Sequence, residues 1–215
     1  MAYCPLAPCA DLSLVNSYPP FMKLSIIVPA KDEEKRIGET LERLGSYITH
    51  PSRGIDRKEV EIIVVVNNTT DGTISVVKQF QKKYPFISYV NIPFYTGKGG
   101  AVALGFQLAK GDYVGFADAD GSSSPREIFK VYRALVEDPD ADGAIANRYL
   151  PDSKIYGGLP QSRRIWSRFF NTAVRMMFSL RYRDTQCGLK VFKKDVAKSL
   201  STRVSTVGWT FDLNL

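Results

Sequence analysis

The stretch DYVGFADADGSSSPRE, residues 112–127, holds the signals that decide the fold. It begins as an apolar strand, brings Asp118 and Asp120 to the end of that strand, and continues into the start of a helix. Ser124 and Glu127 have the spacing of a capping box, which marks the first turn of a helix. Unpaired buried charge is costly, so two acids at this point predict a compensating partner of positive charge.

The same alternation of strands and helices extends upstream of this stretch. We expect apolar strands at 24–30, 60–66, 87–93 and 112–120. We expect helices after the first strand, at 73–84, after the glycines at 99–100 and from Ser124. In the helix after the first strand, apolar residues recur at helical spacing, namely Ile37, Leu41, Leu44 and Ile48. Strands that alternate with helices predict an α/β fold with a mostly parallel sheet flanked by helices.

Composition sets the number of domains. The chain has 215 residues, of which 44% are hydrophobic, and this suits one domain with a sizeable core. Residues 1–22 lack the features of a secretory signal, and we expect them to form a poorly ordered leader outside a domain at 23–215. The longest apolar run, 62–66, is far shorter than the roughly 18 residues of a membrane-spanning helix. Three cysteines without a metal-ligand cluster favour a reducing, cytoplasmic location.

Positive charge is concentrated in the last third of the chain. The formal net charge is +7, and the segment from Ser153 to Arg203 holds twelve Lys and Arg against two acids. Such a segment either faces an anionic partner or forms a solvated basic surface. Because no recognisable nucleic-acid-binding motif is present, we expect no nucleic acid partner and favour phosphate-bearing small molecules or lipid headgroups.

The two acids at the end of the 112–120 strand can hold a metal ion. Ligands of open α/β sheets bind beyond the carboxyl ends of the strands, and side chains two residues apart point the same way in an extended backbone. Asp118 and Asp120 could therefore bind Mg²⁺ or Mn²⁺, with water and phosphate oxygens as further ligands. The alternative is that they only favour the N-terminus of the following helix.

Several motifs occur together in an order that resembles the inverting family-two glycosyltransferases. They are LSIIVPAKDEE, GKGGAVALGFQLAKGDYVGFADADG, DGAIANRYLP, DTQCGLKVF and GWTFDLNL, and they extend from Leu24 to the last residue. Within that family the chain is most similar to the branch of dolichyl-phosphate glucosyltransferases and polyprenyl-phosphate glycosyltransferases. The resemblance implies a GT-A fold, a UDP-sugar or GDP-sugar donor and a metal ion held by the D-x-D motif.

The resemblance also implies a role for individual residues. The donor site would consist of Pro29, Ala30, Asp32, Glu33, Asn67, Lys98, Asp118, Ala119, Asp120 and Arg148. The metal ligands would be Asp118, Asp120 and Ser122. The acceptor phosphate would contact Arg163, Arg164, Ser167 and Gln186. Asn67 and Asn68 stand where the family usually has aspartates, which leaves the preferred nucleobase open.

These motifs also have purely structural interpretations. The segment after the first strand can be an ordinary strand-to-helix loop, and the asparagines can form a turn. The glycines around Lys98 can serve a tight turn instead of a diphosphate. Residues 163–180 mix apolar and basic side chains, which suits either a peripheral element on the cytoplasmic face of a membrane or a core helix with arginines that reach solvent.

The function that the resemblance implies is transfer of a sugar, with inversion, to a polyprenyl or dolichyl phosphate at a membrane surface. A lipid phosphate is already anionic, whereas a hydroxyl acceptor would need a base such as Asp212. The alternatives are transfer to a hydroxyl, a sugar-phosphate nucleotidyltransferase and a non-catalytic nucleotide-binding variant. The family normally continues beyond GWTFD, so we expect this chain to be truncated at its C-terminus.

Overall fold

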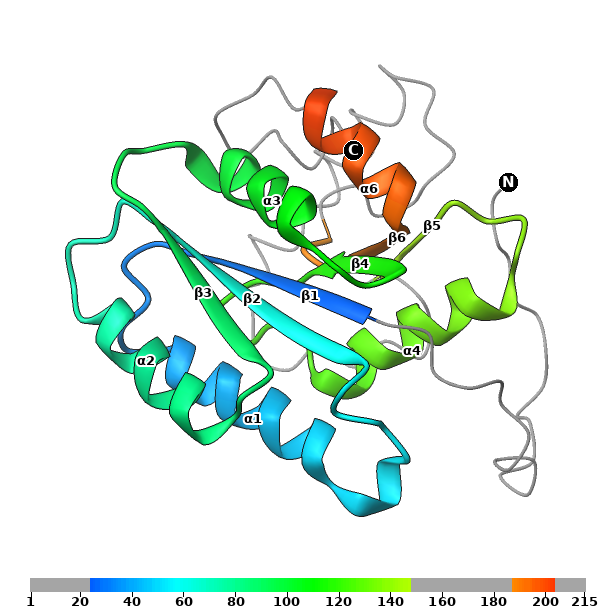
Figure 1. Ribbon diagram of the computed structural model, residues 1–215, viewed down its shortest axis with the longest axis horizontal. Coiled ribbons are helices and arrows are strands. Elements are labelled where there is room, and N and C mark those ends of the chain that lie inside the picture. The colour runs from blue at the N-terminus through cyan, green and yellow to red at the C-terminus, as the bar shows by residue number, and fades with distance from the viewer. Residues whose placement is uncertain (1–23, 148–186, 204–215) are drawn as a thin grey trace, which may run out of the picture.

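The computed structural model describes residues 24–147 and 187–203, and these form a six-stranded sheet with helices on both faces (Figure 1). The strands are β1 (Leu24–Ala30), β2 (Val60–Asn67), β3 (Ile87–Ile92), β4 (Tyr113–Phe116), β5 (Gly143–Ile145) and β6 (Lys190–Lys193). The helices are α1 (Ile37–Thr49), α2 (Thr73–Lys83), α3 (Gly97–Leu108), α4 (Pro125–Glu137) and α6 (Lys194–Arg203), with a short 3-10 helix η2 (Pro51–Arg53). The expected leader, residues 1–22, lies outside the described residues.

The strand order is β3-β2-β1-β4-β6-β5. The strands β3, β2, β1 and β4 run parallel, while β6 is antiparallel to both β4 and β5. From β1 the chain first builds outward through β2 and β3, and then crosses back to place β4 on the other side of β1. This reversal creates a switch point between β1 and β4, where open α/β sheets bind their ligands beyond the carboxyl ends of the strands.

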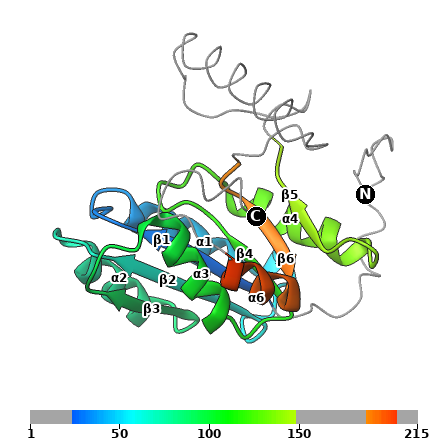
Figure 2. The same cartoon turned by 90° about the horizontal axis from the view of Figure 1, so that it is seen from above.

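The helices form two layers around the sheet. Helices α1, α2 and α4 cover one face, and α3 and α6 cover the other (Figure 2). Strands β1 and β2 are therefore buried on both faces, which explains why their sequences are continuous apolar runs and do not alternate.

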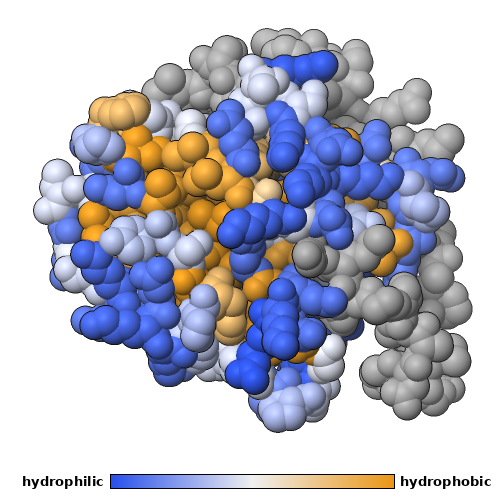
Figure 3. Space-filling model, in the orientation of Figure 1, coloured by the Kyte–Doolittle hydropathy of each residue, from blue (hydrophilic) through white to orange (hydrophobic). Residues whose placement is uncertain are grey.

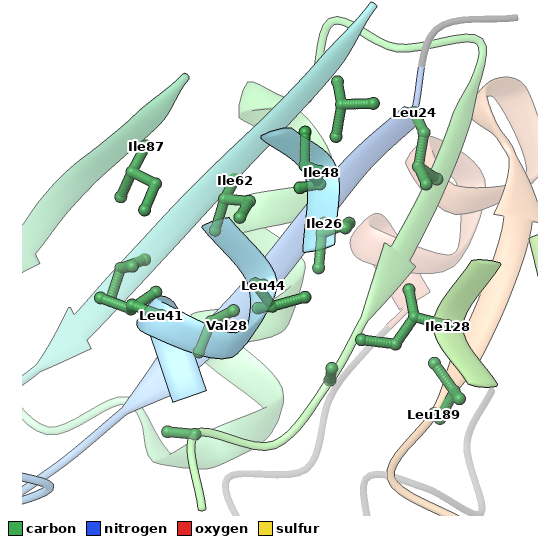
Figure 4. Packing of buried hydrophobic residues seen from close by; sticks show 14 of the residues in the cluster. Leu24, Ile26, Val28, Leu41, Leu44, Ile48, Ile62, Ile87, Ile128 and Leu189 are labelled. Carbon is green, nitrogen blue, oxygen red and sulfur yellow. The ribbon is translucent and has the colours of Figure 1, made fainter. Parts of the chain in front are cut away.

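Each layer has its own core. On the α1 side, Ile26, Leu41, Leu44 and Ile62 pack together with residues of α4 (Figure 4). On the α3 side, the core joins β1, β2, α3 and β4 through Ile27, Val65, Phe106 and Phe116. A Cβ atom at position 105 would collide with the Ile27 side chain, so α3 lies as close to β1 as a glycine permits.

The expected elements are largely confirmed, with two differences beside the predicted site. Strand β1 and the capping box that starts α4 are as expected. Helix α3 begins at Gly97, before the glycines at 99–100, because Gly97 adopts a left-handed backbone that leads directly into the helix. Strand β4 ends at Phe116 instead of continuing to 120, because its pairing with both β1 and β6 stops there.

One face of the molecule carries apolar side chains at its surface. Figure 3 shows a hydrophobic area on the side where Figure 1 has β3 and α3. Phe94, Tyr95 and Leu108 are the exposed large apolar residues of the described ranges, and the first two immediately precede the turn into α3. Across 24–147 and 187–203, no helix combines the length and the apolar character that crossing a membrane requires.

Candidate donor and metal site

The predicted site residues gather where parallel strands end. Glu33 follows β1, Asn67 is the last residue of β2, and Asp118 and Asp120 follow β4. Lys98 lies in the first turn of α3. Because β1, β2 and β4 are parallel, all of these residues belong to the same edge of the sheet, beside the switch point.

Lys98 and Asp118 form an ion pair. Lys98 Nζ lies 2.8 Å from Asp118 Oδ1, and the two side chains are 22% and 31% exposed. Lys98 Nζ also lies 5.5 Å from the centroid of the Phe116 ring, within the range of a cation–π contact. The residue predicted to bind phosphate and a residue predicted to bind metal therefore contact each other directly.

The acids lie in a turn and not on a strand. Gly121 has a left-handed backbone with φ of 71°, which allows the chain to reverse after Asp120. Asp120 Oδ1 accepts a hydrogen bond of 2.9 Å from the backbone N–H of Ser122. The expected alternation of an extended strand therefore does not apply to Asp118 and Asp120, and turn geometry orients Asp120 instead.

Side chains of helix α1 donate hydrogen bonds to backbone carbonyls of the turn that contains Asp120. Thr40 Oγ1 donates a hydrogen bond of 2.7 Å to the carbonyl of Ala119, and Arg43 Nη1 donates one of 3.2 Å to the carbonyl of Gly121. Sequence reasoning missed both residues, because a threonine and an arginine on an amphipathic helix carry no signal of a contact 78 or 79 positions away.

The start of β6 and the residues just before it close the other side of the site. A Cβ atom at position 188 would collide with Asp118 Oδ2, so only Gly188 fits against this carboxylate. Lys190 is 1% exposed, and its Nζ lies 5.4 Å from the centroid of the Phe116 ring. Both residues belong to the DTQCGLKVF motif, but neither was given a role from the sequence.

Glu33 adds a third carboxylate to the neighbourhood. Burial raises the pKa of Glu33 above its ordinary value, and the negative charges of Asp120 and Asp118 raise it further. Arg36, whose Nη2 donates a hydrogen bond of 2.9 Å to Glu33 Oε1, opposes this shift. Burial is therefore the main cause of the raised pKa of Glu33, and the neighbouring carboxylates of Asp118 and Asp120 add to it.

The neighbouring carboxylates suit a divalent cation, because carboxylate oxygens are preferred ligands of Mg²⁺ and Mn²⁺. Within the two described ranges, however, no group of three or more His, Cys, Asp and Glu side chains lies close enough to hold an ion by itself. If Asp118 and Asp120 hold an ion, a substrate phosphate and water would have to complete its coordination shell.

Replacing Glu33 with Gln tests the raised pKa of Glu33 through the pH dependence of stability. The pKa of Glu33 is higher in the folded protein than in the unfolded chain, so the folded protein keeps this proton to a higher pH. The free energy of unfolding therefore falls as pH rises. Without added metal, we expect Glu33→Gln to melt at a higher temperature than the parent near pH 7, with the difference vanishing below about pH 4. Thermal melts of both proteins and of the exposed Glu137→Gln control check this, and a gain at low pH instead would contradict it.

Asp32 connects two loops. Its backbone is left-handed with φ of 52°, its N–H donates to Thr69 Oγ1, and its Oδ1 accepts from the N–H of Thr70 at 2.8 Å. Its Oδ2 pairs with Lys31 Nζ at 2.7 Å, and this hydrogen bond is the main reason why the pKa of Asp32 lies well below its ordinary value. The carboxylate therefore holds the loop after β1 to the loop after β2.

Each of these two loops also donates a backbone N–H group to a carboxylate of the other loop. Glu34 N–H donates to Asp71 Oδ2 at 3.0 Å, and Gly72 N–H donates to Glu34 Oε2 at 3.1 Å. Glu33 N–H donates to Thr73 Oγ1 at 2.9 Å. The predicted donor residues Pro29 and Ala30 end the adjacent β1, so they lie at the base of this joined pair of loops.

Asn67 is buried and connected to the turn before α3. It is 3% exposed, and its Oδ1 accepts hydrogen bonds from Thr96 N–H at 3.0 Å and Thr96 Oγ1 at 3.1 Å. Its Nδ2 donates to the carbonyl of Gly97 at 2.9 Å. The structure thus places Asn67 directly below the turn that presents Lys98.

The other predicted site residues lie outside the described residues. They are Arg148, Arg163, Arg164, Ser167, Gln186 and Asp212, together with the aromatic and basic segment 163–180. Their roles remain predictions.

The six-stranded sheet flanked by helices is a GT-A fold, because the chain is similar in structure to solved GT-A glycosyltransferases. The mannosyltransferase PcManGT from Pyrobaculum calidifontis, in complex with GDP-Man and Mn²⁺, has a TM-score of 0.58 at 20% identity over 83% of this chain and 46% of that one. Glucosyl-3-phosphoglycerate synthase from Mycobacterium tuberculosis, in complex with UDP, has a TM-score of 0.63 at 18% identity over 89% of this chain and 63% of that one.

The chain belongs to glycosyl transferase family 2, whose family model matches residues 25–201. Among its relatives, dolichyl-phosphate β-glucosyltransferase from Drosophila melanogaster is 32% identical over 202 residues, which are 91% of this chain and 62% of the relative. The enzyme of the same name from Homo sapiens is 27% identical, again over 91% of this chain and 62% of the relative. The chain therefore spans less than two thirds of the length of these relatives.

Proposed function

We propose that this chain forms the donor-binding and catalytic part of a metal-dependent inverting glycosyltransferase. Its acceptor would be a polyprenyl or dolichyl phosphate at a membrane surface, and its donor a UDP-sugar or GDP-sugar. The observation that carries the proposal is the ion pair of Lys98 and Asp118, beside Glu33 and Asp120, at the switch point of the sheet. The similarity to dolichyl-phosphate β-glucosyltransferases supports the choice of acceptor.

The donor diphosphate fits between α3 and the turn after β4. Lys98 supplies an ammonium group, and the start of α3 supplies backbone N–H groups that favour an anion. A divalent ion held by Asp118 and Asp120 would stabilise the negative charge that develops on the leaving diphosphate. Asp118 can give up Lys98 when the diphosphate offers that lysine another anionic partner, so the ion pair would be exchanged on donor binding.

The reaction would be a single displacement at the anomeric carbon. An acceptor phosphate oxygen forms a bond to this carbon while the bond to the β-phosphate oxygen breaks, and the electron pair leaves with the nucleoside diphosphate. A phosphate acceptor is anionic at neutral pH and needs no strong general base. Positioning by Arg163 and Arg164 would then matter more than proton removal by Asp212, since guanidinium groups suit bidentate phosphate contacts.

Replacing Arg163 and Arg164 together with Ala tests this function. We expect transfer of glucose from UDP-glucose to dolichyl phosphate in detergent to fall about a hundredfold or more, because two charge-assisted contacts are lost. Donor affinity should change less than about threefold, since the arginines are assigned to the acceptor. Asp212→Asn should have the milder effect on transfer, and Arg126→Ala, an exposed arginine on α4, is the matched control.

Four other outcomes would contradict the proposal. Equal transfer to a soluble hydroxyl acceptor, or indifference to the double replacement, indicates a hydroxyl-glycosylating enzyme with Asp212 as its base. Transfer of the nucleotide to a sugar phosphate indicates a nucleotidyltransferase. Donor binding without transfer or hydrolysis indicates a nucleotide-binding protein without catalysis.

A further inference from the structure

The side-chain amide of Asn67 uses both its oxygen and its nitrogen in hydrogen bonds to the turn before α3. Oδ1 accepts two hydrogen bonds from Thr96, and Nδ2 donates one to the Gly97 carbonyl, so the amide uses its acceptor and its donor on two successive residues. All three bonds join the end of β2 to the start of α3, 29 or 30 positions apart. Buried polar groups of this kind are costly to leave unpaired, so the contacts fix the path of the turn.

A neutral amide satisfies this arrangement, and an ionised carboxylate does not. A carboxylate at position 67 could still accept from Thr96, but its second oxygen would face the Gly97 carbonyl at hydrogen-bond distance with no proton between them. Aspartate is isosteric with asparagine, so this difference is electrostatic and not steric. The asparagine at this position therefore matches the local contacts of this chain.

The turn that Asn67 holds is the one that presents Lys98. Gly97 has φ of 67°, a backbone conformation that strongly favours glycine, and the side chain of Thr96 does not cap α3. A Cβ atom at position 100 would lie 2.6 Å from Thr96 Cβ, so the first turn of α3 closes tightly over Thr96. A shift of Thr96 or Gly97 would move Lys98 away from Asp118.

We infer that Asn67 is a positioning residue, which sets the place of Lys98 and of the N-terminal N–H groups of α3 and does not read the nucleobase. The amide is already engaged with the protein on both of its ends, so the base would be recognised by other groups. The link to the donor diphosphate rests on the proposed function, whereas the effect on the turn does not.

The first experiment measures the turn without any ligand. Hydrogen exchange of the backbone amides at 96–101 is compared between the parent, Asn67→Asp and the neighbouring control Asn68→Asp. Asn68 has a left-handed backbone with φ of 49°, which aspartate tolerates, so the control changes charge by the same amount. We expect exchange about tenfold faster in Asn67→Asp and unchanged in the control. Unchanged exchange in Asn67→Asp would overturn the inference.

The second experiment separates positioning from base recognition. The affinities of UDP and GDP, and of uridine and guanosine, are measured by calorimetry for the same proteins and for Lys98→Met. We expect Asn67→Asp to weaken binding of the preferred diphosphate about tenfold, and that of its nucleoside less than about twofold. In the Lys98→Met background the effect of Asn67→Asp should largely disappear, because the two residues would act through one contact.

The outcomes distinguish this inference from the proposed function. An equal loss of nucleoside and diphosphate affinity would assign Asn67 to the base and overturn the inference. If the parent binds none of these four compounds, the proposed function fails, while the exchange rates still decide whether Asn67 holds the turn.

Discussion

Asp120→Asn is expected to abolish the rise in melting temperature that a nucleotide-sugar and Mn²⁺ give together. In the parent, ligand at a hundred times its dissociation constant adds about 2.7 kcal/mol to the free energy of unfolding, which corresponds to roughly 5–10 °C for a domain of this size. A carboxamide removes the charge that a hard divalent ion requires, while the neutral oxygen can still accept from Ser122 N–H. The fold of the turn should therefore survive and the metal contact should not.

Thermal melts with UDP-glucose or GDP-mannose, each with and without Mn²⁺, measure this effect. Asp140→Asn, an exposed aspartate after α4, is the matched control and should respond like the parent. A shift in Asp120→Asn as large as that of the parent would assign the metal to other residues.

Lys98→Met is expected to change the affinities for metal and nucleotide in opposite directions. The lysine occupies Asp118 Oδ1 at 2.8 Å, so a metal ion that binds without nucleotide must displace it. Because both side chains are partly exposed, solvent weakens the pair, and its loss should tighten Mn²⁺ binding about fivefold. Binding of UDP or GDP should weaken about tenfold to a hundredfold, since one charge-assisted contact to phosphate is lost.

Calorimetric titrations of Mn²⁺ alone, and of each diphosphate with and without Mn²⁺, test both halves of this prediction. Lys78→Met, an exposed lysine on α2, controls for the loss of one positive charge. Weaker Mn²⁺ binding in the absence of nucleotide would show that Lys98 does not compete with the ion for Asp118.

The sequence predicted the parts of the fold that depend on local signals. The apolar run of β1 and the capping box of α4 were found because each is encoded within a few residues. Helix α3 started earlier than expected because Gly97 takes a left-handed conformation that the glycine-rich sequence does not distinguish from an open loop. Strand β6 was not anticipated, since its four residues carry too little pattern to identify an antiparallel strand.

The site was predicted in its chemistry and not in its contacts. Asp118, Asp120 and Lys98 stood out because acids and a lysine follow a strand end and begin a glycine-rich helix. Thr40 and Gly188 did not, because their importance comes from distant backbone and carboxylate groups that only the folded chain brings near. Hydrogen bonds between elements far apart in sequence leave no local pattern.

The position of β6 has a consequence for the order of folding. Strands β1 to β4 and their helices are contiguous in the chain, so their parallel sheet can assemble early, even while a ribosome is still releasing the rest. Strand β6 follows β4 in the chain, so it can add to the free edge of β4 only after the intervening residues have been released. Gly188 and Lys190 are added together with β6, so the turn that carries Asp118 and Asp120 would be covered on this side only in the final stage. An intermediate that lacks β6 would expose both the β4 edge and an incomplete site.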